Sequence, residues 1–194
     1  MNKNDEQILV IPRKELLPEP LHGFVYVSDL PHVMNVMDKI EVKRRGDMEE
    51  DPTYKQLISY VIAVDENDNI LIYTRLTGGG ETRLHGQSSI GVGGHMNPIN
   101  GKTSQELLEE NTLRELKEEL GLTPKKLELI GYVNDDTNSV GQVHFGLVYI
   151  ADVKRSEINI TETDTLEVDF VDMDHLPENM ETWSSLIAEV IKNG

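Results

Sequence analysis

Three glutamates between positions 114 and 122 have the spacing and the chemistry of a cation site. Glu115, Glu118 and Glu119 stand at positions i, i+3 and i+4, so on a helix they share one arc of about 100°. Two carboxylates about 4 Å apart repel each other by roughly 4 kcal/mol at an effective dielectric constant near 20. Such a cluster beside a hydrophobic core takes up protons or holds a cation. Oxygen ligands of high negative charge favour Mg²⁺ or Mn²⁺.

The helix that would carry these carboxylates is predicted over residues 103–120. Thr103 and Glu106 have the spacing of a capping box at its start, and Gly121 suits its end. The apolar side of this helix is formed by three residues spaced for one face: Leu113, Leu116 and Leu120. The carboxylates then lie beside the core stripe. A glutamate-rich helix is more often a solvent-exposed face, so helix geometry alone leaves that alternative open.

A nine-residue motif decides between these alternatives. The chain reads Arg114-Glu115-Leu116-Lys117-Glu118-Glu119-Leu120-Gly121-Leu122, which matches the second half of the Nudix box, Arg-Glu-U-x-Glu-Glu-x-Gly-U, where U is apolar. The chain therefore resembles the Nudix (MutT-like) hydrolase superfamily from about Tyr54 to its C-terminus. The resemblance implies an α/β fold of the Nudix type, an α/β/α sandwich with a mixed β-sheet. It also implies a metal-dependent pyrophosphohydrolase, in which water attacks a phosphorus atom of a nucleoside diphosphate linked to another moiety.

The glycine that opens the Nudix box is displaced in this chain. The box begins with a glycine six residues before its first glutamate, which aligns here with Glu106, but position 100 is Asn. Gly94 ends a predicted strand and is the better candidate, in which case the loop from Met96 to Thr103 carries six extra residues. Gly101, with a shortened spacing, is the weaker alternative. The insertion leaves the role of Glu106 open.

The resemblance also assigns roles to individual residues. It implies that the Gly94 carbonyl joins Glu115, Glu118 and Glu119 as a metal ligand, with Mg²⁺ or Mn²⁺ as the cofactor. The catalytic set is Glu115, Glu118 and Arg114. Glu115 is the first candidate for the general base, and Arg114, at i−4 from Glu118, orients the carboxylates. The family often recruits its base from a later loop, so two further residues stay open as alternatives: Glu162 and Glu167.

Gly93 and Gly94 form a predicted turn, called the glycine turn below, and residues near it are candidates for substrate contacts. Arg75 and Arg83 are suited to bidentate contact with phosphate, although a surface ion pair explains a lone arginine equally well. His95 follows Gly94 directly and is the third candidate for substrate binding. His144 and Trp183 are better explained as core residues than as ligands.

Changes in composition divide the chain near residue 53. Residues 1–53 are predicted to form an N-terminal extension packed on or beside the core, and residues 54–194 the Nudix domain, within a single globular unit. The stretch 44–52 is charged, is interrupted by Gly46 and Pro52, and is predicted to be a linker. Strands are predicted at 7–11, 57–64, 70–73, 88–94, 127–133, 143–153 and 166–171, with helical spacing at 33–40 and a closing helix at 182–192.

Composition narrows the choice of partners. The formal net charge of −17 disfavours nucleic acid polymers and anionic membranes, whose binding requires Lys and Arg. A phosphorylated small molecule then requires a bound cation or a local basic cluster to reverse the local field. No apolar run approaches the roughly 20 residues needed to span a bilayer, the chain has no cysteine, and the predicted location is the cytoplasm. A homodimer is left open.

Two other functions compete with hydrolysis. A Nudix-like domain that senses a nucleotide metabolite without cleaving it would account for the altered loop after Gly94, although such a domain needs no intact glutamate set. Isopentenyl diphosphate isomerase chemistry on a related fold uses a catalytic cysteine, and this chain has none. Hydrolysis therefore remains the leading interpretation.

Overall fold

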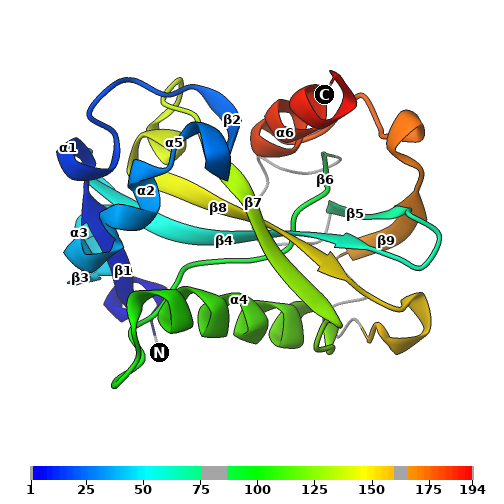
Figure 1. Cartoon of the computed structure of the whole chain (residues 1–194), viewed down its shortest axis with the longest axis horizontal. Helices are drawn as coiled ribbons and strands as arrows, with labels where there is room; N and C mark the ends of the chain where they lie inside the picture. The colour runs from blue at the N-terminus through cyan, green and yellow to red at the C-terminus, as the bar shows by residue number, and fades with distance from the viewer. Residues whose placement is uncertain (1, 76–86, 160–165, 194) are drawn as a thin grey trace.

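A mixed β-sheet with helices on both faces forms the protein (Figure 1). The computed structural model describes residues 2–75, 87–159 and 166–193. Within these ranges the strands are β1 Gln7–Pro12, β2 Gly23–Tyr26, β3 Glu41–Arg44, β4 Tyr54–Val64, β5 Ile70–Arg75, β6 Ser88–Ser89, β7 Lys126–Asn134, β8 His144–Asp152 and β9 Leu166–Val171. The helices are α1 Arg13–Leu16, α2 His32–Asn35, α3 Arg45–Met48, α4 Ser104–Leu120, α5 Ser139–Val143 and α6 Thr182–Asn193.

The central strand β4 organises the sheet. The strand order is β2-β7-β8-β4-β1-β3, and β5 joins β4 to a smaller group formed with β6 and β9. β4 and β8 are parallel along their paired length, whereas β1 and β5 are antiparallel to β4. The sheet is therefore mixed, as predicted. β4 and β5 pair antiparallel at Val64↔Ile70, and β5 also pairs with β9 from Ile70 to Arg75.

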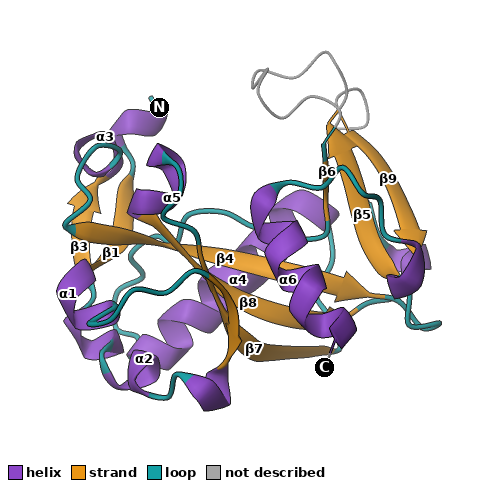
Figure 2. Cartoon of the chain, turned by 90° about the horizontal axis from the view of Figure 1, so that it is seen from above, coloured by secondary structure: helices purple, strands orange, loops and turns teal. Residues whose placement is uncertain are grey.

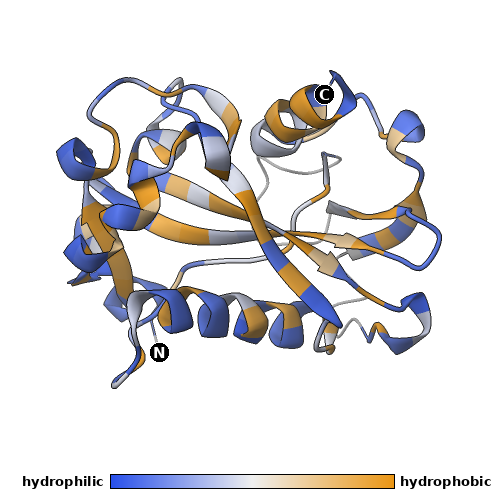
Figure 3. Ribbon diagram, viewed as in Figure 1, coloured by the Kyte–Doolittle hydropathy of each residue, from blue (hydrophilic) through white to orange (hydrophobic). Residues whose placement is uncertain are grey.

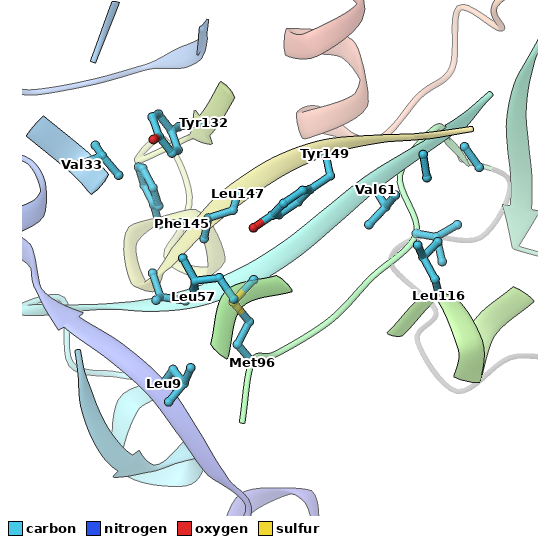
Figure 4. Close-up of a cluster of buried hydrophobic side chains, with 14 of the residues drawn as sticks. Leu9, Val33, Leu57, Val61, Met96, Leu116, Tyr132, Phe145, Leu147 and Tyr149 are labelled. Atoms are coloured by element: carbon cyan, nitrogen blue, oxygen red, sulfur yellow. The ribbon is translucent and has the colours of Figure 1, made fainter. Parts of the chain in front are cut away.

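Alternate residues of β4 face two separate cores. Leu57, Val61 and Ala63 pack in one hydrophobic cluster with residues of α4 such as Leu116 (Figure 4). Tyr60 and Ile62 pack on the opposite face with residues of α6. Helix α4 thus lies below the sheet and α6 above it, with hydrophobic residues along the strands between them (Figures 2 and 3). This arrangement confirms the predicted α/β/α sandwich.

The N-terminal segment contributes strands to the same sheet. β1 pairs with the start of β4, β3 pairs with β1, and β2 pairs with β7 on the far edge. Strands from both sides of residue 53 are thus hydrogen-bonded to each other. A division of the chain near this residue stays a prediction.

The predicted linker at residues 44–52 is wrong. Its first part forms α3, in which Met48 is buried. The Met48 carbonyl oxygen accepts a hydrogen bond from Gln56 Nε2 at 3.1 Å, and Arg45 forms ion pairs with Glu6 and Glu49 at 3.0 and 3.1 Å. A run of charges indicates a linker only when the charged side chains lack partners. Here Arg45 pairs with Glu6, which lies outside the run, and with Glu49, which lies near its end.

Most of the other predicted strands are confirmed, with ends that differ from the predicted ends by no more than three residues. The helical spacing at 33–40 corresponds to α2 followed by a 3₁₀ turn at Met37–Lys39. The predicted strand at 88–94 is shorter as β6 and continues as isolated bridges to β4. Among the described residues, no helix is long and apolar enough to cross a bilayer.

Candidate active site

Helix α4 begins and ends where its sequence predicts. Thr103 is the N-cap, and its hydroxyl accepts a hydrogen bond from the Glu106 N–H at 3.4 Å. The Glu106 carboxylate in turn accepts from the Thr103 N–H at 2.9 Å, which completes the capping box. At the other end Gly121 has a φ of 68°, the left-handed conformation that ends a helix at little cost for glycine. Glu106 is therefore occupied at the helix start, away from the three glutamates of the motif.

The glycine turn runs antiparallel beside β4. The N–H of Ser59 donates to the Gly94 carbonyl oxygen at 3.0 Å, and the N–H of Met96 donates to the Leu57 carbonyl oxygen at 3.0 Å. At Gly93, with a φ of 153°, a Cβ atom would stand 2.0 Å from the Ser59 carbonyl oxygen. Only glycine fits this approach to the strand.

Gly94 lies against the first glutamate of the motif. A Cβ atom on Gly94 would stand 2.7 Å from Glu115 Oε2. A Cβ atom on Gly101, the weaker candidate for the opening glycine, would have no other atom within 4 Å, and Gly101 lies in the exposed loop. The geometry therefore favours Gly94 as the glycine of the site.

Glu115 is a desolvated carboxylate. The residue is 8% exposed. Burial raises its pKa to about 7 against the opposing effect of Arg114, and the neighbouring Glu118 and Glu119 raise it further. A buried carboxylate beside two others is stabilised by a proton or by a cation.

Arg114 ties the glycine turn to α4. Its guanidinium donates to the His95 carbonyl oxygen at 3.0 Å and to Asn97 Oδ1 at 2.7 Å. The same group forms ion pairs with Glu115 at 2.7 Å and with Glu118 at 3.2 Å. Arg114 thus orients two carboxylates, as the sequence predicts, and also clamps the backbone that carries Gly94.

The lengthened loop is anchored at Asn97, its second residue. The Asn97 N–H donates to Asn111 Oδ1 at 2.7 Å, and Asn111 Nδ2 donates back to the Asn97 carbonyl oxygen at 2.9 Å. Asn97 Nδ2 also donates to Glu6 Oε1 at 2.8 Å. The extra residues therefore project outward beyond Asn97 without displacing Gly94. Sequence reasoning missed this pair, although a buried Asn111 in a helix is a signal of such a role.

The residues present fit a hard divalent cation. Glu118 and Glu119 are exposed on the same arc as Glu115, and the Glu118 side chain is 57% exposed. Within the described ranges, no three acidic or histidine side chains already converge on one point. The predicted ligands, three carboxylates and the Gly94 carbonyl, are all oxygen donors, which matches the preference of Mg²⁺ and Mn²⁺.

A cavity of about 530 Å³ opens on the other side of the glycine turn. Its walls come from β4, the glycine turn, the segment before β8 that includes α5, and the start of α6. The residues that line it are Ile58, Gln87, Gly93, Gly94, His95, Asp135, Asn138, Ser139, Val140, Gly141, His144, Glu181, Thr182 and Trp183. Gly94 therefore borders both this cavity and Glu115, and a ligand at the turn can reach both.

Two imidazoles meet in the cavity wall. His95 Nε2 lies 3.1 Å from His144 Nε2 and 2.8 Å from Gln56 Oε1, and His144 Nδ1 lies 2.6 Å from the Val140 carbonyl oxygen. Burial lowers the pKa of His95 to about 3, with Arg45 and His144 adding to the effect. His144 is buried as predicted for a core histidine, but it lines the cavity as well. Trp183 likewise packs against Tyr60 and lines the cavity.

Arg13 of the N-terminal segment and Lys55 of β4 hold residues 135–144, called the cavity loop below, in place. Arg13 forms an ion pair with Asp136 and donates to the Gln142 carbonyl oxygen at 3.3 Å. The fully buried Lys55 donates to Asp136 at 2.8 Å, to the Gly141 carbonyl oxygen at 2.7 Å and to the His144 carbonyl oxygen at 3.1 Å. Burial lowers the pKa of Lys55 in spite of Asp136. Three acceptors around Nζ nevertheless favour the ammonium form, which has three donors.

The remaining predicted residues are placed less fully. Arg83 and Glu162 lie outside the described residues, and Arg75 is described only as the last position of β5. Glu167 lies in β9, pairs in register with Thr74, is exposed and does not line the cavity. His95 lines the cavity, next to Gly94. The catalytic, metal-binding and substrate-binding roles of all these residues stay predictions.

Comparison with known proteins decides the family. Residues 55–192 match the NUDIX domain family. The chain belongs to the Nudix family of hydrolases. Membership confirms the resemblance carried by the Arg114–Leu122 motif, and it confirms the prediction of a Nudix pyrophosphohydrolase. Members of this family generally act with divalent metal ions on small phosphorylated substrates.

Individual relatives agree with this placement. Protein YmaB of Bacillus subtilis (strain 168) is 39% identical over 208 aligned residues, which cover 99% of this chain and 100% of YmaB. The crystal structure of Tm1382, a protein assigned to the Nudix hydrolases, has a TM-score of 0.81 and 30% identity, covering 97% of this chain and 99% of Tm1382. The similarity to Tm1382 extends over the N-terminal segment as well. An ADP-ribose pyrophosphatase of Methanocaldococcus jannaschii is 39% identical over 74 residues, which cover 38% of this chain and 43% of that enzyme.

Proposed function

We propose that this Nudix hydrolase cleaves the diphosphate linkage of a nucleoside diphosphate joined to another moiety, with Mg²⁺ or Mn²⁺ as its cofactor. The observation that carries the proposal is the contact between Gly94 and the buried Glu115, which lies within α4 in the complete Arg114–Leu122 motif. The partial similarity to an ADP-ribose pyrophosphatase makes ADP-ribose the first substrate to test. A cytoplasmic location and the division into residues 1–53 and 54–194 belong to the same proposal.

The chain's own residues supply the site for that chemistry. Glu115, Glu118, Glu119 and the Gly94 carbonyl oxygen are the proposed ligands. A bound divalent ion withdraws charge from a diphosphate and lowers the pKa of bound water. Arg114 keeps the turn and the helix in register, since its guanidinium bonds to both.

The general base has three candidates. Glu115 is the first candidate because it is the carboxylate nearest to Gly94. Glu162 and Glu167 stay as alternatives from the later part of the chain. Arg75, Arg83 and His95 are the proposed substrate contacts, the two arginines for phosphate. The proposed partner is a small phosphorylated molecule and no nucleic acid polymer, and a homodimer stays open.

A phosphate-release assay tests the proposed function. Nucleoside diphosphate derivatives would be incubated with the protein and a phosphatase, in Mg²⁺, Mn²⁺ or EDTA. Turnover is expected with a metal and none with EDTA. Glu118→Gln is expected to abolish turnover, whereas Glu110→Gln, an exposed residue of the same helix paired with Lys102, is expected to retain it. Full activity of Glu118→Gln would contradict the proposed metal site.

The sensor function makes a different prediction. The lengthened loop after Gly94 is the feature that favours it, because added residues near a site can slow turnover. A sensor would bind one nucleotide metabolite tightly and release no product after long incubation with Mn²⁺. Product formation at a rate that scales with protein concentration would exclude it.

A further inference from the structure

The hydrogen bonds around His95 assign its protons. Gln56 Nε2 donates to the Met48 carbonyl oxygen at 3.1 Å, so Gln56 Oε1 is the acceptor that faces His95 Nε2. His144 Nδ1 donates to the Val140 carbonyl oxygen at 2.6 Å, so in the neutral ring His144 Nε2 is an acceptor as well. His95 Nε2 stands between two acceptors and therefore carries the hydrogen.

The consequence is a bare acceptor in the cavity wall. A neutral imidazole with its hydrogen on Nε2 has a lone pair on Nδ1. Among the described residues, His95 Nδ1 has no hydrogen-bond partner and does not belong to the buried atoms that lack one, so Nδ1 is accessible, and His95 is a residue of the cavity wall. A ligand atom that meets Nδ1 must bring a hydrogen.

Each charged group of the cavity is an acceptor, whereas Gln87, Ser139 and Thr182 of the lining carry both donors and acceptors. Asp135 and Glu181 are the charged residues among its described lining, and both are carboxylates. Glu181 Oε1 already accepts from Tyr60 and Ser184 at 2.6 and 2.7 Å, whereas Glu181 Oε2, within the described part of the chain, accepts the Trp183 N–H at 3.2 Å. One Glu181 oxygen thus keeps acceptor capacity. No lysine or arginine belongs to the described lining, so this cavity is unsuited to phosphate.

Apolar and aromatic surface completes the walls. Ile58, Val140 and Trp183 line the cavity, and Val140 is 55% exposed at its edge. A volume of about 530 Å³ lies within the usual range for small-molecule sites, which are mostly apolar with a few oriented polar groups. A flat, uncharged heterocycle that donates hydrogen bonds satisfies all of these features, whereas a sugar leaves the apolar surface uncovered.

We infer that the cavity binds an amino-bearing nucleobase of the substrate, with His95 Nδ1 and a carboxylate of the wall accepting its N–H groups. This inference rests on the proposed function for the position of the phosphates, which would lie across Gly94 beside Glu115. His95 then determines specificity for the base and makes no contact with phosphate.

Matched pairs of nucleoside 5′-monophosphates test the inference. Each pair differs only in the exocyclic amino group: adenosine with purine riboside, guanosine with inosine, and cytidine with zebularine. Binding to the full chain would be measured by titration calorimetry in Mg²⁺. At least one amino-bearing member is expected to bind about fivefold or more tightly than its partner. Equal affinities in all three pairs, or ribose 5-phosphate binding as tightly as the nucleotides, would overturn the inference.

A variant locates the acceptor. His95→Leu is expected to reduce the preference to about onefold, whereas His175→Leu, whose side chain is 81% exposed, is expected to leave it unchanged. A preference that persists in a folded His95→Leu would overturn the role of His95. Where circular dichroism shows that His95→Leu does not fold, the wild-type comparison decides. Binding does not depend on turnover, so a base preference without hydrolysis contradicts only the proposed function, and hydrolysis without a preference contradicts only this inference.

Discussion

The backbone of Gly94 and the carboxylate of Glu115 are in direct contact, although the two residues belong to different elements. A Cβ atom on Gly94 would stand 2.7 Å from Glu115 Oε2, closer than a methyl group tolerates. The Gly94 carbonyl oxygen accepts the Ser59 N–H at 3.0 Å, and together with the buried carboxylate it belongs to the proposed set of oxygen ligands for a hard cation.

Gly94→Ala is expected to reduce kcat/KM by about 100-fold or more, because the added methyl group displaces the Glu115 carboxylate from the turn. Steady-state kinetics with the best substrate of the screen would measure the loss. Gly101→Ala is the matched control, since nothing lies within 4 Å of its Cβ position. Its φ of 77° predicts a stability loss of about 1 kcal/mol with unchanged kcat. A reversed pattern would make Gly101 the glycine of the site.

Glu106→Gln is expected to retain activity within about twofold and to leave the melting temperature unchanged, because glutamine also completes a capping box. Thr103→Ala is expected to lower the free energy of unfolding by about 1 kcal/mol, since it removes the N-cap oxygen of α4. Thermal and urea unfolding would measure both effects. Loss of turnover in Glu106→Gln with an intact fold would instead place this glutamate in the metal site.

Arg13→Gln is expected to raise KM by about five- to tenfold with kcat changed by less than twofold. Arg13 contacts Asp136 and the Gln142 carbonyl oxygen, so its loss loosens the cavity loop without touching the glutamates of α4. Arg44→Gln is the control, because Arg44 pairs with Asp5 and Asp47 on the surface. A fall in kcat at constant KM would show that the N-terminal segment supports the chemistry and not the cavity.

Asp136 is expected to stabilise the fold in a pH-dependent way. Burial opposes its ionised form, but hydrogen bonds from Arg13 and Lys55 outweigh burial and lower its pKa from 3.8 to about 2. A depressed folded-state pKa gives stability that is present above the unfolded pKa and is lost as pH falls toward the folded value. The side chain is 28% exposed, so after solvent screening the contribution is about 1 kcal/mol.

Urea unfolding of the wild type and of Asp136→Asn would measure this effect. The difference in unfolding free energy between them is expected to be constant above pH 5 and to shrink as pH falls from about 4 toward 2. Asp172→Asn, with a side chain that is 62% exposed, should show no such convergence. A difference that is independent of pH would mean that Asp136 acts through packing and not through its charge.

Local features of this protein could be predicted from its sequence. The cap, two of the three predicted core leucines (Leu116 and Leu120) and the end of α4 follow from residues within one helix, because their interactions repeat at fixed short spacing. Leu113 is only partly buried, because the buried side of α4 is formed with Leu108 and Thr112 instead. The Arg114–Leu122 motif lies in that helix and identified the family. Strand β9 and helix α6 were predicted almost to the residue from alternation and helical spacing.

Features that join distant segments came only from the tertiary structure. The charges of α3 indicated a linker, because their partner Glu6 lies far away in the chain. Likewise His95 meets His144 across 49 positions, and Arg13 reaches Asp136 across 123. Such pairs leave no periodic trace in the sequence, since strand pairing and not local spacing brings them together.

The sequence by itself therefore determined the helix, the motif and the reaction class of this protein. The tertiary structure decided that Gly94 rather than Gly101 lies against Glu115, and that a cavity of about 530 Å³ borders Gly94. The physical reason is that the motif is carried by one helix and the two residues after it, whereas a cavity is the space left between elements that pack from opposite ends of the chain.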